Sequence, residues 1–141
     1  MTLAPADVPE VTVAIAAEAD LILVRQVLRA EAQRSDLGLV DQTKLVTAGS
    51  ELARNVLTYA TGSRGELRVE EVRSGVRRGV RATFFDDGPG IDDVDAAMAD
   101  GFSTGGSLGL GLPGSRRLAD EMTITSAKGS GTTVVIVKWR R

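Results

Sequence analysis

The sequence contains neither cysteine nor histidine among its 141 residues. Without cysteine there is no disulfide, no thiolate nucleophile and no cysteine zinc site. Without histidine there is no Ser-His-Asp triad, no imidazole base and no phosphohistidine intermediate on this chain. Any catalysis must therefore use carboxylates, amides, hydroxyls and backbone dipoles, together with an imported metal or cofactor.

Long apolar runs and an excess of either charge are missing as well. The longest apolar run near the start, residues 13–17, is far shorter than the roughly 20 residues that span a membrane. Residues 1–10 contain no Lys or Arg, so the basic part of a signal peptide is absent, and we expect a cytoplasmic protein. The 17 basic and 19 acidic residues give a net charge of −2, which provides no general attraction to nucleic acid or to an anionic membrane.

The length and composition are those of one soluble globular domain. Apolar residues make up 43% and charged residues 26% of the chain, and a domain of this size can fold without a disulfide or metal. Residues 1–9, which contain Pro5 and Pro9, are expected to form a short arm. Residues 10–141 are then expected to form a single domain.

The hydrophobic periodicity predicts an α+β layer sandwich. Strands are expected at 11–15, 66–72, 80–85, 122–126 and 132–139, and helices at 20–34, 41–60 and 112–120. Asp41 is the expected cap of the second helix, and Ser74-Gly75 is the expected hairpin turn. The last strand is apolar on both faces, as a central strand is. We therefore expect a largely antiparallel sheet with helices on one face.

Eight of the 16 glycines lie within residues 86–114. Gly109-x-Gly111-x-x-Gly114 matches the dinucleotide fingerprint, but loop-like residues precede it and no acidic residue ends a second strand about 20 positions on. We therefore disfavour a Rossmann fold, and no Walker pattern occurs. A glycine-rich loop that opens a helix still exposes backbone N–H groups to phosphate oxygens. Because so many glycines are costly in chain entropy, we favour phosphate binding over a merely flexible loop.

Two further patterns are ambiguous when each is taken alone. Glu51 and Asn55 are spaced i,i+4 and share one helix face, where a carboxylate could accept a proton and an amide oxygen could hold a hard cation. A solvated helix pair is the commoner interpretation of such a spacing. Asp86-Asp87-Gly88-Pro89-Gly90 follows a strand. It is either an Asx-type turn or a strand-end carboxylate that accepts a hydrogen bond from an exocyclic amine.

The order of these patterns resembles a known ATP-binding domain. Glu51-Leu-Ala-Arg-Asn55 is similar to the N box of the Bergerat (GHKL) superfamily, which includes histidine kinases, gyrase B and MutL. Two later segments resemble its glycine boxes, Asp86-x-Gly88-x-Gly90 and Gly106-x-x-Gly109-Leu-Gly111, and Gly131-Thr132 follows them in order. The resemblance covers about residues 11–139. Within the superfamily, the chain looks like the bacterial anti-sigma and switch serine kinases, which consist of the bare domain.

This resemblance implies a Bergerat-type two-layer sandwich with a mixed, mainly antiparallel sheet, helices on one face and a glycine-rich ATP lid. It implies that Glu51 is the general base toward the substrate hydroxyl and that Asn55 coordinates Mg²⁺. Asp86 would accept a hydrogen bond from the adenine amine, helped by Thr132. The other implied nucleotide-binding residues are Gly88, Gly90, Ser103, Thr104, Gly106, Gly109, Leu110 and Gly111. Phosphoryl transfer depends chiefly on positioning and charge stabilisation, so it needs neither histidine nor cysteine.

The same resemblance implies a protein-serine/threonine kinase that uses ATP and Mg²⁺ in a partner-switching stress response. Its implied substrates are STAS-domain antagonist proteins of the RsbS and RsbR type, whose phosphorylation would free the kinase to activate a PPM-type phosphatase. One alternative is an anti-sigma factor kinase that also sequesters a sigma factor. Another is a non-catalytic ATP-dependent binding module. No nucleic acid or membrane partner is expected.

Overall fold

A computed structural model describes residues 10–59, 65–90, 98, 111–127 and 129–141 of the chain. The elements in chain order are β1 (Val11–Ile15), α1 (Asp20–Arg34), α2 (Leu39–Tyr59), β2 (Gly65–Ser74), β3 (Arg77–Asp86), α4 (Leu112–Leu118), β4 (Glu121–Ser126) and β5 (Thr132–Trp139). The expected N-terminal arm and most of the expected lid lie outside the described residues.

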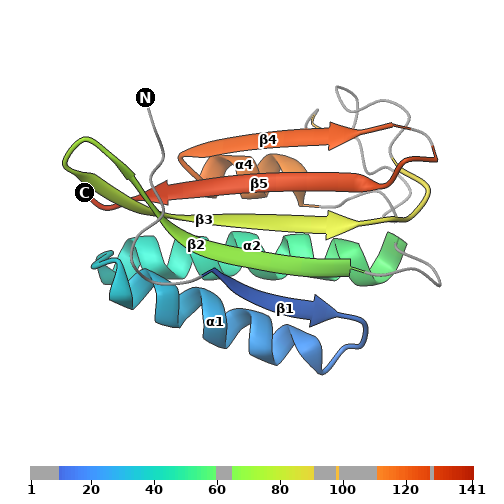
Figure 1. The fold of residues 1–141 in the computed structure, drawn as a ribbon, viewed down its shortest axis with the longest axis horizontal. Coiled ribbons are helices and arrows are strands. Elements are labelled where there is room, and N and C mark those ends of the chain that lie inside the picture. The colour runs from blue at the N-terminus through green and yellow to red at the C-terminus, as the bar shows by residue number, and fades with distance from the viewer. Residues whose placement is uncertain (1–9, 60–64, 91–97, 99–110, 128) are drawn as a thin grey trace.

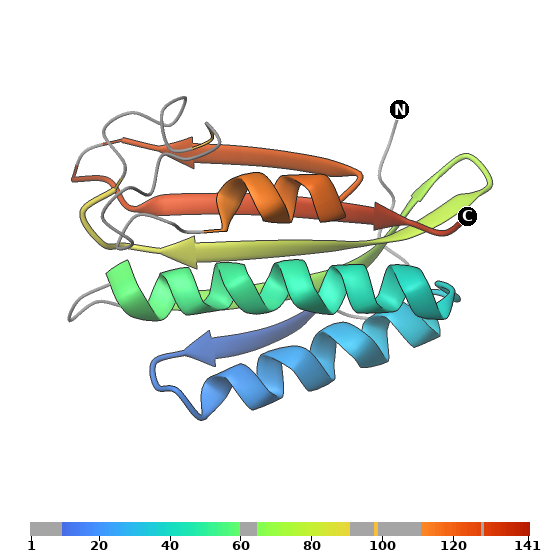
Figure 2. The ribbon, with the colours of Figure 1, turned by 180° about the vertical axis from the view of Figure 1, so that it is seen from behind.

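The five strands form one sheet in the order β1-β2-β3-β5-β4, and every pairing among the described strands is antiparallel. All three described helices cover the same face of this sheet, with α2 between α1 and α4 (Figures 1 and 2). The predicted α+β sandwich is therefore confirmed. The strand predicted to be central, β5, lies inside the sheet between β3 and β4.

The core lies between the helices and the covered face of the sheet. Its largest members are Leu21 and Leu28 from α1, Leu45 and Leu52 from α2, Leu112 from α4, and Leu67, Phe84 and Ile136 from the sheet. Gly49 of α2 packs directly against Leu28 of α1, since a Cβ placed on it would be only 2.2 Å from Cδ1 of Leu28. The apolar residues that recur at helical spacing in the sequence are thus the residues that the two helices bury against the sheet.

The prediction that Asp41 caps the second helix is wrong. The helix begins at Leu39, and its first hydrogen bond runs from the Gln42 amide to the Gly38 carbonyl. Asp41 instead lies in the first turn, where its carboxylate is 3.4 Å from Nζ of the buried Lys138 on β5. A long-range ion pair therefore accounts for this acidic residue, and local sequence did not reveal it.

The predicted hairpin is confirmed, although both of its strands are longer than expected. The β2–β3 register runs from Gly65–Asp86 to Ser74–Arg77, with Gly75 at φ +62° in the turn. The third helix ends at Leu118 rather than at Asp120. Ala119 is already extended, with φ −87° and ψ 159°, and the Asp120 amide donates to the Val137 carbonyl of β5 at 2.9 Å instead of continuing the helix.

Within the described residues, no helix is long and apolar enough to cross a membrane.

Candidate nucleotide site

Four residues form a row across one end of the sheet. Gly65 pairs with Asp86, Asp86 with Thr132, and Thr132 with Ser126, so the row crosses β2, β3, β5 and β4. Asp86 lies on the helix-covered face, because it alternates in register with the buried residue Phe84. The Ser126 and Thr132 hydroxyl oxygens are 2.8 Å apart, within hydrogen-bonding distance. A carboxylate and two hydroxyls are therefore gathered at one end of the sheet, where Asp86 lies on the face that the helices cover.

Asp86 is the acid of this row, and only 8% of its surface is exposed. Its Oδ1 accepts a hydrogen bond from the Gly88 amide at 2.9 Å. Burial raises the pKa of the carboxyl above its ordinary value, outweighing the hydrogen bond from Gly88, and the charge of Asp87 acts in the same direction as burial. Within the described residues, no hydrogen bond reaches Oδ2. This oxygen can accept a donor from a ligand, and such a donor would repay part of the cost of burial.

Two glycines bring the loops beyond this row into close contact. A Cβ on Gly90 would lie 2.0 Å from the Ala127 carbonyl oxygen, and a Cβ on Gly131 would lie 2.3 Å from the Asp86 carbonyl oxygen. Both have positive φ, +81° and +76°. The Gly129 amide also donates to the Pro89 carbonyl at 2.6 Å. These glycines are therefore required for the packing of one loop on the other, which holds the backbone around Asp86.

Glu51 lies on α2 beside the start of α4. A Cβ on Gly111, the residue before α4, would be 2.9 Å from Oε2 of Glu51, and Gly111 has φ +62°. Asn55 lies one turn further along the same face and is half-exposed. A Cβ on Gly65 would be 2.0 Å from Cγ1 of Val56, so this turn of α2 covers the end of the sheet where Asp86 lies.

The structure therefore brings several predicted site residues to one end of the molecule. Asp86, Gly88, Gly90 and Thr132 lie at the sheet end, and Glu51, Asn55 and Gly111 lie where α2 meets α4. The other predicted residues, Ser103, Thr104, Gly106, Gly109 and Leu110, lie outside the described residues. Ser126 was not predicted, and its only signal in the sequence is a hydroxyl residue at a strand end.

The described residues of the site offer few side chains that could hold a metal ion. Among the described residues, no group of three or more acidic side chains is placed to hold a metal ion. The side chains there with oxygen atoms that suit a hard cation belong to Asn55, Glu51 and Asp86. Such a sparse donor set suits Mg²⁺, which keeps several waters and takes phosphate oxygens as ligands.

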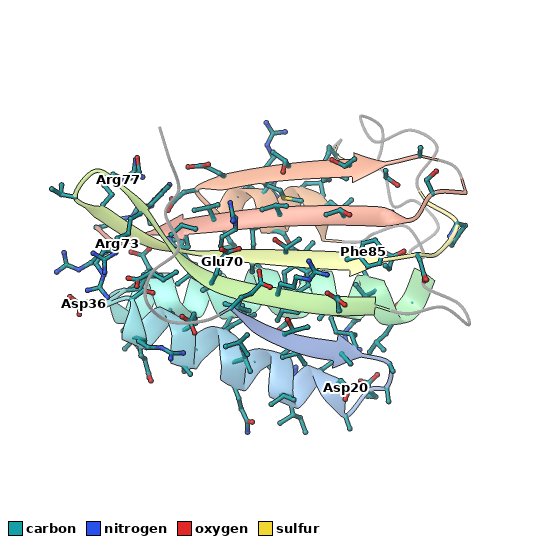
Figure 3. All side chains as sticks on the ribbon, viewed as in Figure 1. Asp20, Asp36, Glu70, Arg73, Arg77 and Phe85 are labelled. Atoms are coloured by element: carbon teal, nitrogen blue, oxygen red, sulfur yellow. The ribbon has the colours of Figure 1, made fainter. Side chains whose placement is uncertain are left out.

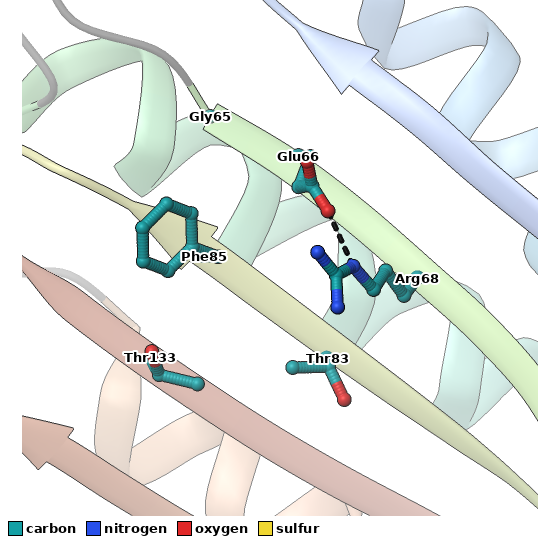
Figure 4. Close-up of a pocket in the computed structure, with 6 residues that line it drawn as sticks. All are labelled: Gly65, Glu66, Arg68, Thr83, Phe85 and Thr133. Carbon is teal, nitrogen blue, oxygen red and sulfur yellow. Dashed lines mark hydrogen bonds and ion pairs between the residues drawn. The ribbon is translucent and has the colours of Figure 1, made fainter.

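A separate groove of about 530 Å³ lies on the opposite, helix-free face of the sheet (Figure 4). It is lined by Gly65, Glu66, Arg68, Thr83, Phe85 and Thr133, with Glu66 paired to Arg68 across its floor. Thr83 and Phe85 alternate with the buried residues Ala82 and Phe84, so their side chains point away from the helices. None of the predicted site residues that the structure describes lines this groove.

Residues 40–141 match the family of histidine kinase-, DNA gyrase B- and HSP90-like ATPases. The chain belongs to this family, which confirms the predicted Bergerat-type fold and the use of ATP. Most of the chain is also similar to the serine/threonine-protein kinase RsbT of Bacillus subtilis (strain 168). The two are 43% identical over 129 residues, covering 92% of this chain and 96% of RsbT. The predicted enzyme class, a protein-serine/threonine kinase, is thereby confirmed.

Proposed function

We propose that this chain transfers the γ-phosphate of ATP to a serine or threonine of a STAS-domain antagonist protein of the RsbS or RsbR type. Phosphorylation of that partner would release the kinase to activate a PPM-type phosphatase. The observation that carries this proposal is the 43% identity to RsbT over 92% of the chain. The buried carboxylate at the end of the helix-covered sheet face supports it.

In this proposal Asp86 selects the base of the nucleotide. Its Oδ1 is occupied by the Gly88 amide at 2.9 Å, so Oδ2 would accept a hydrogen bond from the adenine amine. The hydrogen-bonded hydroxyls of Thr132 and Ser126 lie beside it in the same row and would bind the base through water. Gly88 and Gly90 would let the backbone approach the base. A guanine carbonyl would face the carboxylate and be repelled, which favours ATP over GTP.

Asn55 and Glu51 would have different roles although they share one helix face. Mg-ATP supplies the phosphoryl group together with the cation that neutralises its charge. The Asn55 amide oxygen would be the protein ligand of this Mg²⁺. The exposed Glu51 carboxylate would take the proton of the substrate hydroxyl as general base. Ser103, Thr104, Gly106, Gly109, Leu110 and Gly111 would surround the phosphates.

The test is incubation of the chain with γ-labelled ATP, Mg²⁺ and an RsbS-type STAS protein, followed by gel filtration and mass spectrometry. We expect label on a serine or threonine of the STAS protein and a complex that dissociates once this hydroxyl is phosphorylated. Capture of a sigma factor in place of the STAS protein would favour the anti-sigma alternative. Nucleotide-dependent binding without any label transfer would favour the non-catalytic binding module.

A further inference from the structure

The outer side of α1 presents a face without charge to solvent. The exposed residues of this face are spaced as one side of a helix and are Ala19, Ile22, Leu23, Gln26, Ala30 and Gln33. The two large aliphatic side chains are adjacent, and Ile22 is 58% and Leu23 46% exposed. The solvent side of a surface helix normally carries charged residues. Exposed apolar surface with a polar rim is typical of a protein interaction site.

This face begins beside the candidate nucleotide site. Glu18, just before α1, forms an ion pair of 3.3 Å with Arg54 on α2, and Arg54 immediately precedes Asn55. The turn that leads into α1 is held by the Asp20 carboxylate, which accepts hydrogen bonds from the Ala16 and Ala17 amides at 2.8 and 2.9 Å. Asp20 lies toward the same end of the molecule as Phe85, the neighbour of Asp86 (Figure 3). A protein docked here would therefore border the site.

Cations dominate the border of this face. Arg25, Arg29 and Arg34 come from α1 and Arg54 from α2, against the acids Glu18 and Asp20. Asp20 is engaged with backbone amides, Glu18 is paired with Arg54, and Arg34 is paired with the buried Glu31. Among the described residues, this leaves Arg25 and Arg29 as the cations of the border that form no ion pair. The chain as a whole has a net charge of −2, so this excess of positive charge is local. A complementary surface would combine apolar side chains with carboxylates at their edge.

We propose that the outer face of α1 is the docking surface for the protein that is phosphorylated, and that this protein presents an apolar ridge bordered by carboxylates. The inference rests on the proposed function, because it assigns the position of that substrate. Ile22 and Leu23 bind the substrate and take no part in the chemistry. Ile22 and Leu23 determine which protein is phosphorylated, whereas Glu51 and Asn55 are needed for the transfer of the phosphoryl group.

The test uses the full chain with Ile22→Asp or Leu23→Asp, and Leu39→Asp as the matched control. Leu39 is 71% exposed on the first turn of α2, at the other end of the helical layer. With an RsbS-type STAS protein as the acceptor, we expect the two α1 variants to raise the KM for the acceptor at least about tenfold. The kcat at saturating acceptor and the ATP affinity should be unchanged, because the chemistry is untouched. Leu39→Asp should behave like the wild type.

An unchanged KM in folded α1 variants, while the wild type transfers phosphate, would overturn the docking surface and leave the proposed function intact. If the wild type transfers no phosphate, the proposed function fails, and calorimetric binding of the same STAS protein decides the docking question. Binding that the α1 variants lose would then support the surface, whereas equal binding or none would overturn it. Two other results with an unchanged KM would also overturn the proposal. If the wild type forms a dimer that the α1 variants abolish, this face binds a second copy of the chain. If the wild type binds anionic vesicles and the variants do not, this face binds lipid.

Discussion

At the scale of single residues, Asp86 combines an energetic cost with a binding role. Its carboxyl is nearly buried, and burial raises its pKa above the ordinary value of 3.8 despite the hydrogen bond from Gly88. Asp86→Asn keeps an oxygen for the Gly88 amide but turns a donor toward the adenine amine. We expect ATP affinity to fall about tenfold or more, because a charge-assisted hydrogen bond is replaced by two opposed donors. Calorimetry measures this, with the exposed Asp87→Asn as control.

The same substitution has a predicted pH dependence of stability. Because the pKa of Asp86 is higher in the folded than in the unfolded protein, ionising the buried carboxyl costs stability. This cost is absent below pH 3.8, where the carboxyl is protonated in both states, and is fully present above the folded pKa. Asp86→Asn should therefore gain stability over the wild type as pH rises through this interval, and should match it at lower pH. Urea unfolding across pH measures the difference. A variant less stable than the wild type at neutral pH would mean that Asp86 is stabilising in the free protein.

Glu51 and Asn55 allow two roles on one helix face to be separated. Glu51→Gln should retain ATP binding but slow phosphoryl transfer by about 10²–10⁴-fold, the usual contribution of a general base. Asn55→Ala should instead lose the Mg²⁺-dependent part of ATP affinity. Glu10→Gln is the matched control for Glu51, since Glu10 is exposed and precedes β1 at the end of that strand away from Gly65. If binding and transfer fell together in Glu51→Gln, Glu51 would not be acting as a base.

At the scale of secondary-structure elements, the loops beyond β3 and β4 depend on glycine for two separable reasons. Gly131→Ala would combine a positive φ with a Cβ 2.3 Å from the Asp86 carbonyl oxygen. Gly129→Ala would have a similar φ of +79° but no neighbour within 4 Å. We expect a loss of about 1 kcal/mol of stability for Gly129→Ala. For Gly131→Ala we expect about 2–5 kcal/mol, with weaker ATP binding as well. Equal losses in denaturant unfolding would show that the loop contact is unimportant.

Elements with a strong periodic pattern were predicted well from the sequence. The helix expected at 20–34 matches α1 at both ends, because its apolar spacing and the first-turn residue Asp20 are local signals. Asp86 was placed correctly at a strand end for the same reason. Ser126 was missed because it lies beside Thr132 only through the register of β4 against β5. The two residues are six positions apart in the sequence, and a loop with glycines separates them, so local sequence does not show that they pair. The predicted cap of α2 was wrong because Asp41 forms an ion pair with Lys138, which lies nearly one hundred positions away in the sequence.

At the scale of the whole molecule, Lys138 joins β5 to α2 and to the turn before β4, at the end opposite to the candidate site. It is 2% exposed, and its Nζ lies 3.2 Å from Asp120 before β4 and 3.4 Å from Asp41 on α2. Lys138→Met leaves both carboxylates without this partner and should cost about 3–5 kcal/mol at neutral pH. Adding Asp41→Asn and Asp120→Asn should recover much of the loss. Urea unfolding measures both, and Lys44→Met on α2 is the control.

The same cluster predicts a loss of stability in acid. Burial alone would raise the pKa of Asp120, but the Trp139 amide, Lys138 and Arg141 together hold it below its ordinary value. A carboxylate with a lowered folded pKa contributes stability above pH 3.8 that is lost as pH falls through the folded value. Asp120→Asn should therefore be destabilising near neutral pH, with a deficit that shrinks on acidification. A deficit that does not change with pH would assign the effect to lost hydrogen bonds alone.

The central claim is that ATP binds on the helix-covered face, at the sheet end formed by Asp86, Thr132 and Ser126. The most direct test is an NMR titration of the labelled protein with a non-hydrolysable ATP analogue and Mg²⁺. We predict the largest amide shifts at Gly88, Gly131 and Thr132 and in the Glu51–Asn55 turn of α2. Shifts centred instead on Glu66, Arg68 and Thr83, in the groove of the opposite face, would contradict the account.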